Sequence, residues 1–219
     1  MKVLLAGATG AIGRPLTKRL VEAGHEVVGL TRREDRLAEV EAAGARGVVC
    51  DVTERRAVLA IAGEVRPDVV MDQTTALPQR YDPRKMEKFY EQMVPLRLVG
   101  SPNLIEAAQA VGAKSAFQSI AFMYAPGNGR VCTEDDPPYE RDAPFPWDLA
   151  LPAIIALERR VVDIGGLVLR YGMFYGPETH FDTGQIAEDV GRRRFPVVGK
   201  GTGVFSFVHV EDAADATVV

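Results

Sequence analysis

The sequence predicts an α/β fold in which helices cover both faces of a doubly wound parallel β-sheet. Short β-branched runs alternate along the chain with segments of helical periodicity, which is the pattern of strands joined by crossover helices. A glycine-rich turn separates the first run from the first helical segment. At 219 residues, the chain has the length of one domain with a substantial buried core.

Strands and helices are expected in alternation. The strands are expected at residues 2–7, 25–31, 46–51, 68–73, 115–120 and 166–172. A first helix is expected over 14–24, where apolar side chains fall near one face. A helix over 101–112 has Ser101 as its expected cap and ends at Gly112.

The second half contains a long loop and an apolar helix. Residues 126–146 are rich in Gly, Pro and Asp, a composition that predicts a loop. Loops of this length inside compact domains are usually functional or mobile. The stretch "WDLALPAIIALE" at 147–158 follows, and we expect it to open a helix beside the reaction centre.

The composition restricts the partners and the compartment. With 26 Lys and Arg against 30 Asp and Glu, the net charge of −4 argues against nucleic acid or an anionic membrane as a partner. No apolar run approaches the roughly 20 residues that cross a bilayer, so we expect a cytoplasmic protein. Cys50 and Cys132 lack metal-ligand spacing, so we expect free thiols and no metal site.

The glycine-rich turn "AGATGAIG" predicts a phosphate cradle. Gly7, Gly10 and Gly13 follow the first strand and open the first helix. Glycine at these positions lets the backbone approach a pyrophosphate, which then binds the free N–H groups and positive end of the helix. A plain tight turn is the alternative.

The end of the second strand favours NADP over NAD. An NAD enzyme usually has Asp or Glu there for the adenosine ribose, whereas a 2′-phosphate requires arginine. The chain has Thr31 at this point, followed by Arg32 and Arg33. The alternative is that both arginines start the next helix in solvent, with Glu34 and Asp35 as partners.

Together these features resemble the extended short-chain dehydrogenase/reductase superfamily, and within it the NAD-dependent epimerase/dehydratase family, in an atypical form. Besides "GATGAIG", the resemblance rests on "VVCDVT", "VVMDQTTA", "VGSPNLIEAA", "LRYGMFYGP" and "GVFSFVHVEDAADA", in the family's order. It implies a Rossmann-type fold that binds NADP, or NAD, at the carboxyl ends of its strands, together with a small-molecule substrate.

The resemblance also implies which residues contact the cofactor. Asp51 matches the family residue that hydrogen-bonds the adenine amino group, and Val52 is its neighbour. The complete implied set is Gly7, Thr9, Gly10, Ala11, Ile12, Gly13, Arg32, Asp51, Val52, Thr74 and Tyr171.

The catalytic residues of that family do not carry over. The family has a Tyr that transfers a proton, a Lys four residues later that lowers its pKa, and a Glu four residues after the Lys. If Glu158 is this Glu, the Lys and Tyr positions hold Ile154 and Ala150. The family's substrate-binding Ser or Thr falls at Ile120. Ser119 is adjacent, but neighbouring strand residues face opposite sides unless the strand is bulged or the alignment shifts by one.

Three residues are candidates for catalysis. They are Ser119, Tyr124 and Tyr139, and packing is the alternative role for each tyrosine. Arg192–Arg194 form either a solvated helix end or a site for an acidic substrate group. Met173 stands where nucleotide-sugar epimerases tend to have Asn, which argues against a nucleotide-sugar substrate.

Two functions stay open at this point. In the first, the protein is an oxidoreductase or epimerase that acts on a small carbonyl or sugar-like substrate without the usual Tyr-x-x-x-Lys pair. In the second, it is a non-catalytic NADP(H)-binding or redox-sensing protein. A homodimer is also open, and the fold alone does not choose between the functions.

The expected domain division falls near residue 180. Residues 1–180 form the dinucleotide-binding domain, and 181–219 begin a smaller substrate-binding region that is incomplete, because relatives of the family continue further. In the last helix we expect an apolar stripe with little to pack against, consisting of Ala213, Ala216 and Val219. We therefore expect either a fragment of a longer protein or a partner chain over that face.

Overall fold

A parallel six-stranded sheet forms the centre of the molecule. The computed structural model describes residues 1–77, 86–125, 131–139, 147–182, 184–195, 197 and 200–218. The strands are β1 (Lys2–Ala6), β2 (Glu26–Thr31), β3 (Arg46–Val49), β4 (Val69–Asp72), β5 (Lys114–Ile120) and β6 (Leu167–Tyr171). All six predicted strands are confirmed, with small differences at their ends.

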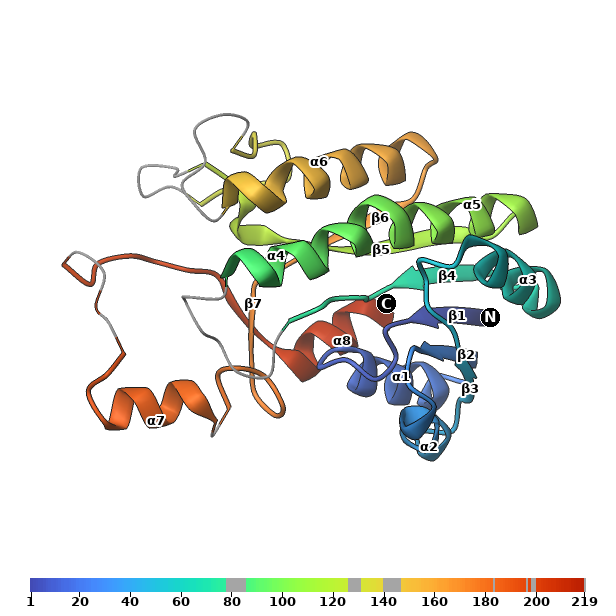
Figure 1. Cartoon of the computed structure of the whole chain (residues 1–219), viewed down its shortest axis with the longest axis horizontal. Helices are drawn as coiled ribbons and strands as arrows, with labels where there is room; N and C mark the ends of the chain where they lie inside the picture. The colour runs from blue at the N-terminus through green and yellow to red at the C-terminus, as the bar shows by residue number, and fades with distance from the viewer. Residues whose placement is uncertain are drawn as a thin grey trace.

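The strand order places a crevice at the carboxyl ends of β1 and β4. The order is β3-β2-β1-β4-β5-β6, so the chain turns from one half of the sheet to the other between these two strands (Figure 1). Doubly wound sheets bind their ligands at such a switch point, outside the carboxyl ends of the strands.

Helices cover both faces of this sheet (Figure 1). One face carries α3 (Arg55–Val65), α4 (Met86–Pro95), α5 (Ser101–Val111) and α6 (Trp147–Asp163). The other carries α1 (Gly13–Glu22), α2 (Leu37–Ala42) and α8 (Val210–Val218). The alternation of strand side chains separates two apolar cores: Phe117 packs with Leu104 of α5, and Leu5 packs with Leu16 of α1.

Shorter elements complete the described chain. They are the 3-10 turns Glu34–Arg36 and Ala121–Met123, the π-helical turn Leu96–Gly100, α7 (Gln185–Gly191), and a separate pair of strands, β7 (Met173–Tyr175) and β8 (Phe207–His209).

The prediction that Ser101 caps a helix was wrong. The π-helical turn Leu96–Gly100 runs directly from α4 into α5, so Ser101 is already helical and makes no capping hydrogen bond. Its hydroxyl instead donates to the buried carboxylate of Asp72. The predicted end of this helix is confirmed, because Gly112 adopts a left-handed φ of +73° as its C-cap.

The prediction that the apolar stripe of the last helix has little to pack against was wrong for Ala213 but not for Ala216, and Val219 lies outside the described residues. Val210, Ala213 and Ala214 are buried in the core that includes Leu16 of α1, whereas Ala216 is exposed. The buried face of α8 therefore lies one turn earlier than expected and packs on α1.

The long loop and the apolar helix follow the prediction where they are described. Of the loop at 126–146, residues 131–139 contain a turn and one antiparallel bridge, between Tyr124 and Pro138, and the other loop residues lie outside the described ones. The helix predicted to open at 147 is α6. Among the described residues, no helix combines the length and apolar character needed to cross a bilayer.

Candidate functional site

The predicted phosphate cradle joins β1 to α1. Gly7 has a φ of +83°, and a Cβ added there would lie 2.5 Å from the carbonyl oxygen of Gln73. A Cβ on Gly13 would lie 2.0 Å from the carbonyl oxygen of Gly7, so packing within the protein excludes larger residues at both positions. At Gly10 the nearest contact is 3.2 Å. Internal packing is therefore a weaker reason for glycine at position 10.

The other residues of the turn, Thr9, Ala11 and Ile12, lie at the N-terminus of α1, and Arg36 contacts Thr9. Ile12 is buried beneath the turn, whereas Thr9 and Ala11 are partly exposed. Arg36, which the sequence analysis missed, donates from Nη2 to the carbonyl oxygen of Thr9 at 3.4 Å. The positive end of α1 favours an anion at this turn, whereas the charge of Arg36 is paired with Glu39 at 2.8 Å. Binding of a pyrophosphate here stays a prediction.

The two arginines after β2 have different surroundings. Thr31 is buried, and its hydroxyl oxygen accepts a hydrogen bond from the backbone N–H of Arg33 at 3.3 Å. Arg33 forms an ion pair with Asp35, as the solvated-helix alternative expects. Arg32 is exposed and forms no ion pair with any residue that the structure describes. Arg32 is thus the arginine whose charge is available to a ligand.

The segment after β3 is held in a fixed conformation. Asp51 Oδ1 accepts hydrogen bonds from the backbone N–H of Thr53 at 2.9 Å and from its hydroxyl at 2.8 Å. Asn103 of α5 donates to the carbonyl oxygen of Val52 at 2.9 Å. These contacts orient the Asp51 carboxylate. Its hydrogen bond to an adenine amino group stays a prediction.

A buried ionic cluster lies at the end of β4. Asp72 is fully buried, and its Oδ1 accepts hydrogen bonds from the backbone N–H of Thr74 at 2.8 Å and the Thr74 hydroxyl at 2.6 Å. Its Oδ2 accepts a hydrogen bond from Ser101 and lies 3.8 Å from Nη1 of Arg97. Neither Asp72 nor Arg97 was among the site residues predicted from the sequence.

Tyr171 is engaged inside the protein. Its hydroxyl lies 2.7 Å from Oγ1 of Thr217 and accepts a hydrogen bond from Nε2 of Gln73 at 3.2 Å. Burial raises the pKa of Tyr171, while the hydrogen bonds to Thr217 and Gln73 oppose that rise. These contacts hold the Tyr171 hydroxyl inside the protein, and its contact with a cofactor stays a prediction.

The first half of α6 is apolar where it faces the protein. Ala150 and Ile154, the two positions expected to correspond to the family's Tyr and Lys, are 1% and 6% exposed. They form an apolar cluster with Leu151 and with Met123 of the turn after β5. Neither side chain can exchange a proton.

Further along α6, Glu158 forms a buried ion pair with Arg170 of β6. Hydrogen bonds run from Arg170 Nε and Nη2 to the carboxylate, and Nη1 donates to the hydroxyl of Tyr124. The hydrogen bond to Glu158 is the largest cause of a raised pKa of Arg170. Arg170 therefore places a cation beside Tyr124, which was not predicted from the sequence.

The other two catalytic candidates lie around the same turn. Ser119 is buried and its hydroxyl contacts Sδ of Met123 at 3.8 Å. The backbone N–H of Tyr139 donates to the carbonyl oxygen of Met123 at 2.9 Å, and its side chain packs on the apolar cluster of α6. The structure thus brings Ser119, Tyr124 and Tyr139 close to Met123, and a catalytic role for any of them stays a prediction.

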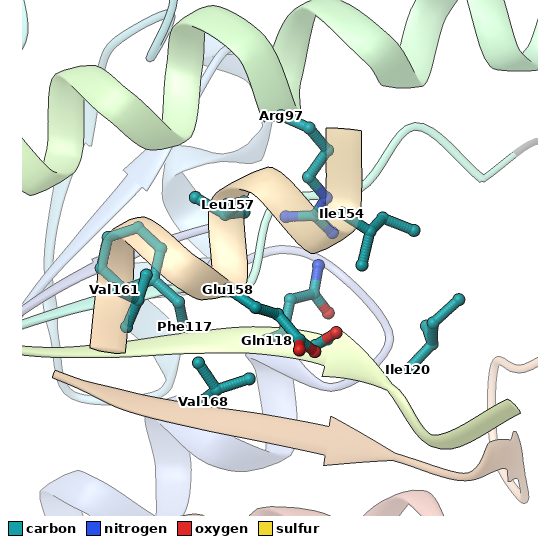
Figure 2. A pocket seen from close by; sticks show the side chains of 10 residues that line it. Arg97, Phe117, Gln118, Ile120, Ile154, Leu157, Glu158, Val161 and Val168 are labelled. Atoms are coloured by element: carbon teal, nitrogen blue, oxygen red, sulfur yellow. The ribbon is translucent and has the colours of Figure 1, made fainter. Parts of the chain in front are cut away.

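A small cavity lies between α6 and the strands β5 and β6 (Figure 2). Its walls are formed by apolar side chains such as Phe117 and Leu157, by Ser119 and Glu158, and by Arg97, which enters from the π-helical turn.

Comparison with known proteins assigns the family. The sequence profile described as the NAD dependent epimerase/dehydratase family matches residues 3–219. The chain belongs to this family. Its fold is accordingly the NAD-binding Rossmann fold, as the resemblance of the sequence motifs implied.

Two reductases and an epimerase illustrate the similarity. A 3-diazoavenalumate denitrifying reductase from a Streptomyces species is 44% identical over 224 residues, which cover 100% of this chain and 71% of that protein. A 2-alkyl-3-oxoalkanoate reductase from Stenotrophomonas maltophilia is 24% identical over 226 residues, covering 98% of this chain and 63% of that protein.

The epimerase comparison concerns the fold alone. The UDP-glucose 4-epimerase of Thermus thermophilus, solved in complex with NAD, superposes with a TM-score of 0.74 at 24% identity. The match covers 99% of this chain and 73% of that one. The chain therefore spans between 63% and 73% of the length of these three proteins.

Proposed function

We propose that this protein is an NADPH-dependent reductase that replaces the diazo group of a diazo-substituted aromatic acid by hydrogen and releases dinitrogen. The similarity to a 3-diazoavenalumate denitrifying reductase, 44% identical over the whole of this chain, supports the substrate class. The observation that carries the proposal is the apolar face of α6, with Ala150 and Ile154 buried at the end of the sheet.

Reduction of a diazonium carbon needs no proton from the protein. Reduction of a carbonyl produces an alkoxide that must be protonated, which is the task of the family's tyrosine. In the proposed reaction the hydride of NADPH forms a new C–H bond, and the C–N bond breaks with its electron pair leaving in N₂. The carbon gains two electrons, NADPH becomes NADP⁺, and the charges balance without general acid catalysis.

The proposed reaction also explains why α6 has apolar side chains at positions 150 and 154 in place of the family's Tyr and Lys. An ionised phenol couples with a diazonium ion and an amine adds to it, so the family's lysine-activated tyrosine at positions 150 and 154 would react with this substrate. Alanine and isoleucine do neither. Leu151 and Met123 extend the apolar surface, which keeps water from replacing the diazo group.

NADPH is the proposed form of the cofactor because of the charges after β2. Thr31 provides no carboxylate for a free ribose hydroxyl, and Arg32 has no ion-pair partner among the described residues. We propose that residues 1–180 hold the cofactor and that 181–219 begin the substrate-binding region.

A substrate panel tests the proposed function. The protein would be incubated with NADPH and, separately, an arenediazonium carboxylate, a 2-alkyl-3-oxoalkanoate and UDP-glucose, with loss of NADPH and formation of N₂ measured. We expect turnover above the protein-free rate with the diazonium compound alone. Turnover of the oxoalkanoate instead, or no increase with the diazonium compound, would contradict the proposal.

A non-catalytic NADP(H)-binding protein is the second candidate. The apolar face of α6 is compatible with it too, because a binding protein needs no proton donor. Tight binding of NADPH without oxidation by any member of the panel would favour this function over the first.

A further inference from the structure

Arg97 carries a buried guanidinium with unused hydrogen-bonding capacity. The residue is 8% exposed and lies in the π-helical turn Leu96–Gly100 between α4 and α5. Its Nη1 has no hydrogen-bond partner among the residues that the structure describes. Buried polar groups in folded proteins nearly always have partners, so an unpaired donor in a cavity wall points to a ligand. π-Helical turns are also frequent at functional sites.

Asp72 balances the charge of Arg97 but does not satisfy its N–H groups. The Asp72 oxygens already accept hydrogen bonds from Thr74 and from Ser101, and Nη1 of Arg97 remains 3.8 Å from Oδ2. A distance of 3.8 Å exceeds that of a hydrogen bond. The Nη1 donor of Arg97 is therefore available to a further acceptor.

The cavity that Arg97 enters has room for one small group. Figure 2 shows the Arg97 side chain beside α6, close to Ile154 and above Gln118 of β5. The cavity volume is about 20 Å³, which is the space of about one water molecule. This volume accommodates the end of a carboxylate but excludes an aromatic ring. Glu158, the other charged residue in the wall, is neutralised by Arg170.

Arg97 is also connected to the region where the cofactor is expected. Asp72, its ionic partner, is the last residue of β4 and binds Thr74 directly. Gln118 of β5 donates to the carbonyl oxygen of Thr74. The cavity thus adjoins the carboxyl ends of β4 and β5, where ligands of doubly wound folds bind.

We infer that Arg97 binds the carboxylate of the substrate, with one carboxylate oxygen in the cavity beneath α6. That the acid is aromatic and carries a diazo group rests on the proposed function, whereas the recognition of a carboxylate by Arg97 rests on the geometry of the cavity. A guanidinium suits this role because its N–H groups match carboxylate geometry. Arg97 is accordingly a residue that determines specificity for acids over their neutral esters.

Binding measurements test this inference without any turnover. Calorimetry would compare 4-hydroxycinnamate with its methyl ester on the NADP⁺-bound protein. We expect the wild-type protein to bind the acid at least about tenfold more tightly, which corresponds to one charged hydrogen bond. Equal affinity for acid and ester in the wild-type protein overturns the inference, and this comparison needs no variant.

Variants locate the effect at Arg97. Arg97→Met should abolish the preference for the acid, and Arg97→Lys should keep part of it, while NADP⁺ affinity stays within about twofold in both. The double variant Arg97→Met/Asp72→Asn removes both charges together, in case the single substitution unfolds the protein. Arg194→Met is the control, because Arg194 is an exposed member of the arginine run that the sequence offered for the same task. Loss of the preference in Arg194→Met, or its persistence in Arg97→Met, overturns the inference.

This test is separate from the test of the proposed function. A preference for the acid that depends on Arg97 supports the inference even if no diazonium compound is reduced. Reduction of the diazonium acid and its ester with equal KM values contradicts the inference and leaves the proposed reaction intact.

Discussion

Glu158 of α6 accepts three hydrogen bonds from Arg170 of β6, two from Nε at 3.0 and 3.2 Å and one from Nη2 at 2.6 Å. Arg170 also donates to the carbonyl oxygen of Glu134 at 3.2 Å and to the Tyr124 hydroxyl. One guanidinium therefore joins the apolar helix, the sheet and the described part of the loop after β5.

Loss of this pair should destabilise the protein. Glu158→Ala removes the ion pair and leaves Arg170, which is partly exposed, with its hydrogen bonds to Tyr124 and Glu134, so we expect the free energy of unfolding in urea to fall by about 2 kcal/mol. Glu188→Ala is the control, since Glu188 pairs with Arg192 at 3.9 Å on the surface of α7, and its loss should cost less than about 1 kcal/mol. Similar losses in the two variants would contradict the role given to Glu158.

Substitution at Gly10 should separate cofactor binding from folding. An added Cβ meets only a 3.2 Å contact inside the protein, so Gly10→Ala should fold, but we expect NADPH affinity to fall by about tenfold or more because the methyl group takes up ligand space. Gly63→Ala, with no atoms near the added Cβ in α3, should leave affinity unchanged. Thermal unfolding measures the stability of the variants and calorimetry measures their affinity for NADPH. Unchanged affinity in Gly10→Ala would contradict the assignment of this turn as a phosphate cradle.

Arg32 and Arg33 should differ in their effect on cofactor choice. We expect Arg32→Ala to weaken NADPH binding by a factor of about 10 to 100 through loss of a charged hydrogen bond to the 2′-phosphate, with NADH affinity unchanged. Arg33→Ala is the matched control, because Arg33 is already paired with Asp35. Equal affinities of the wild-type protein for NADPH and NADH would contradict the preference itself.

The strands were predictable because each is a short β-branched run between turn residues, and burial in a parallel sheet requires that pattern. The glycine turn between β1 and α1 was predictable for a similar reason, since Gly7 and Gly13 leave no space for a side chain, whereas pyrophosphate binding at this turn stays a prediction. Local pattern was sufficient in both cases.

Arg97 and Arg170 were not predictable, because a buried arginine depends on partners distant in the chain. Asp72 pairs with Arg97, and Glu158 pairs with Arg170, across different elements. In the sequence, the one indication of a buried arginine was its position inside an otherwise apolar segment. The prediction that Ser101 caps a helix was wrong for the same reason. Its hydroxyl hydrogen-bonds the carboxylate of Asp72, which is distant in the chain, in place of a backbone N–H at the helix start.

Restoring the family's catalytic pair should not produce a fast carbonyl reductase. In Ala150→Tyr/Ile154→Lys both new side chains enter a buried apolar cluster, and the lysine lines the same cavity as Arg97, which carries a like charge. We expect a less stable protein with no large gain in oxoalkanoate reduction, measured as turnover with NADPH. A large gain would show that the rest of a carbonyl-reducing site is intact.

The origin of the hydrogen in the product tests the central claim most directly. The protein would convert an arenediazonium carboxylate with NADPH deuterated at C4, using each of the two C4 isotopomers in turn, and in parallel with unlabelled NADPH in D₂O. The account predicts deuterium at the former diazo carbon from one isotopomer only, and none from D₂O, because the hydride comes from one face of the bound cofactor and no proton enters the product. Deuterium from D₂O, or equal transfer from both isotopomers as in the protein-free reaction, would contradict it.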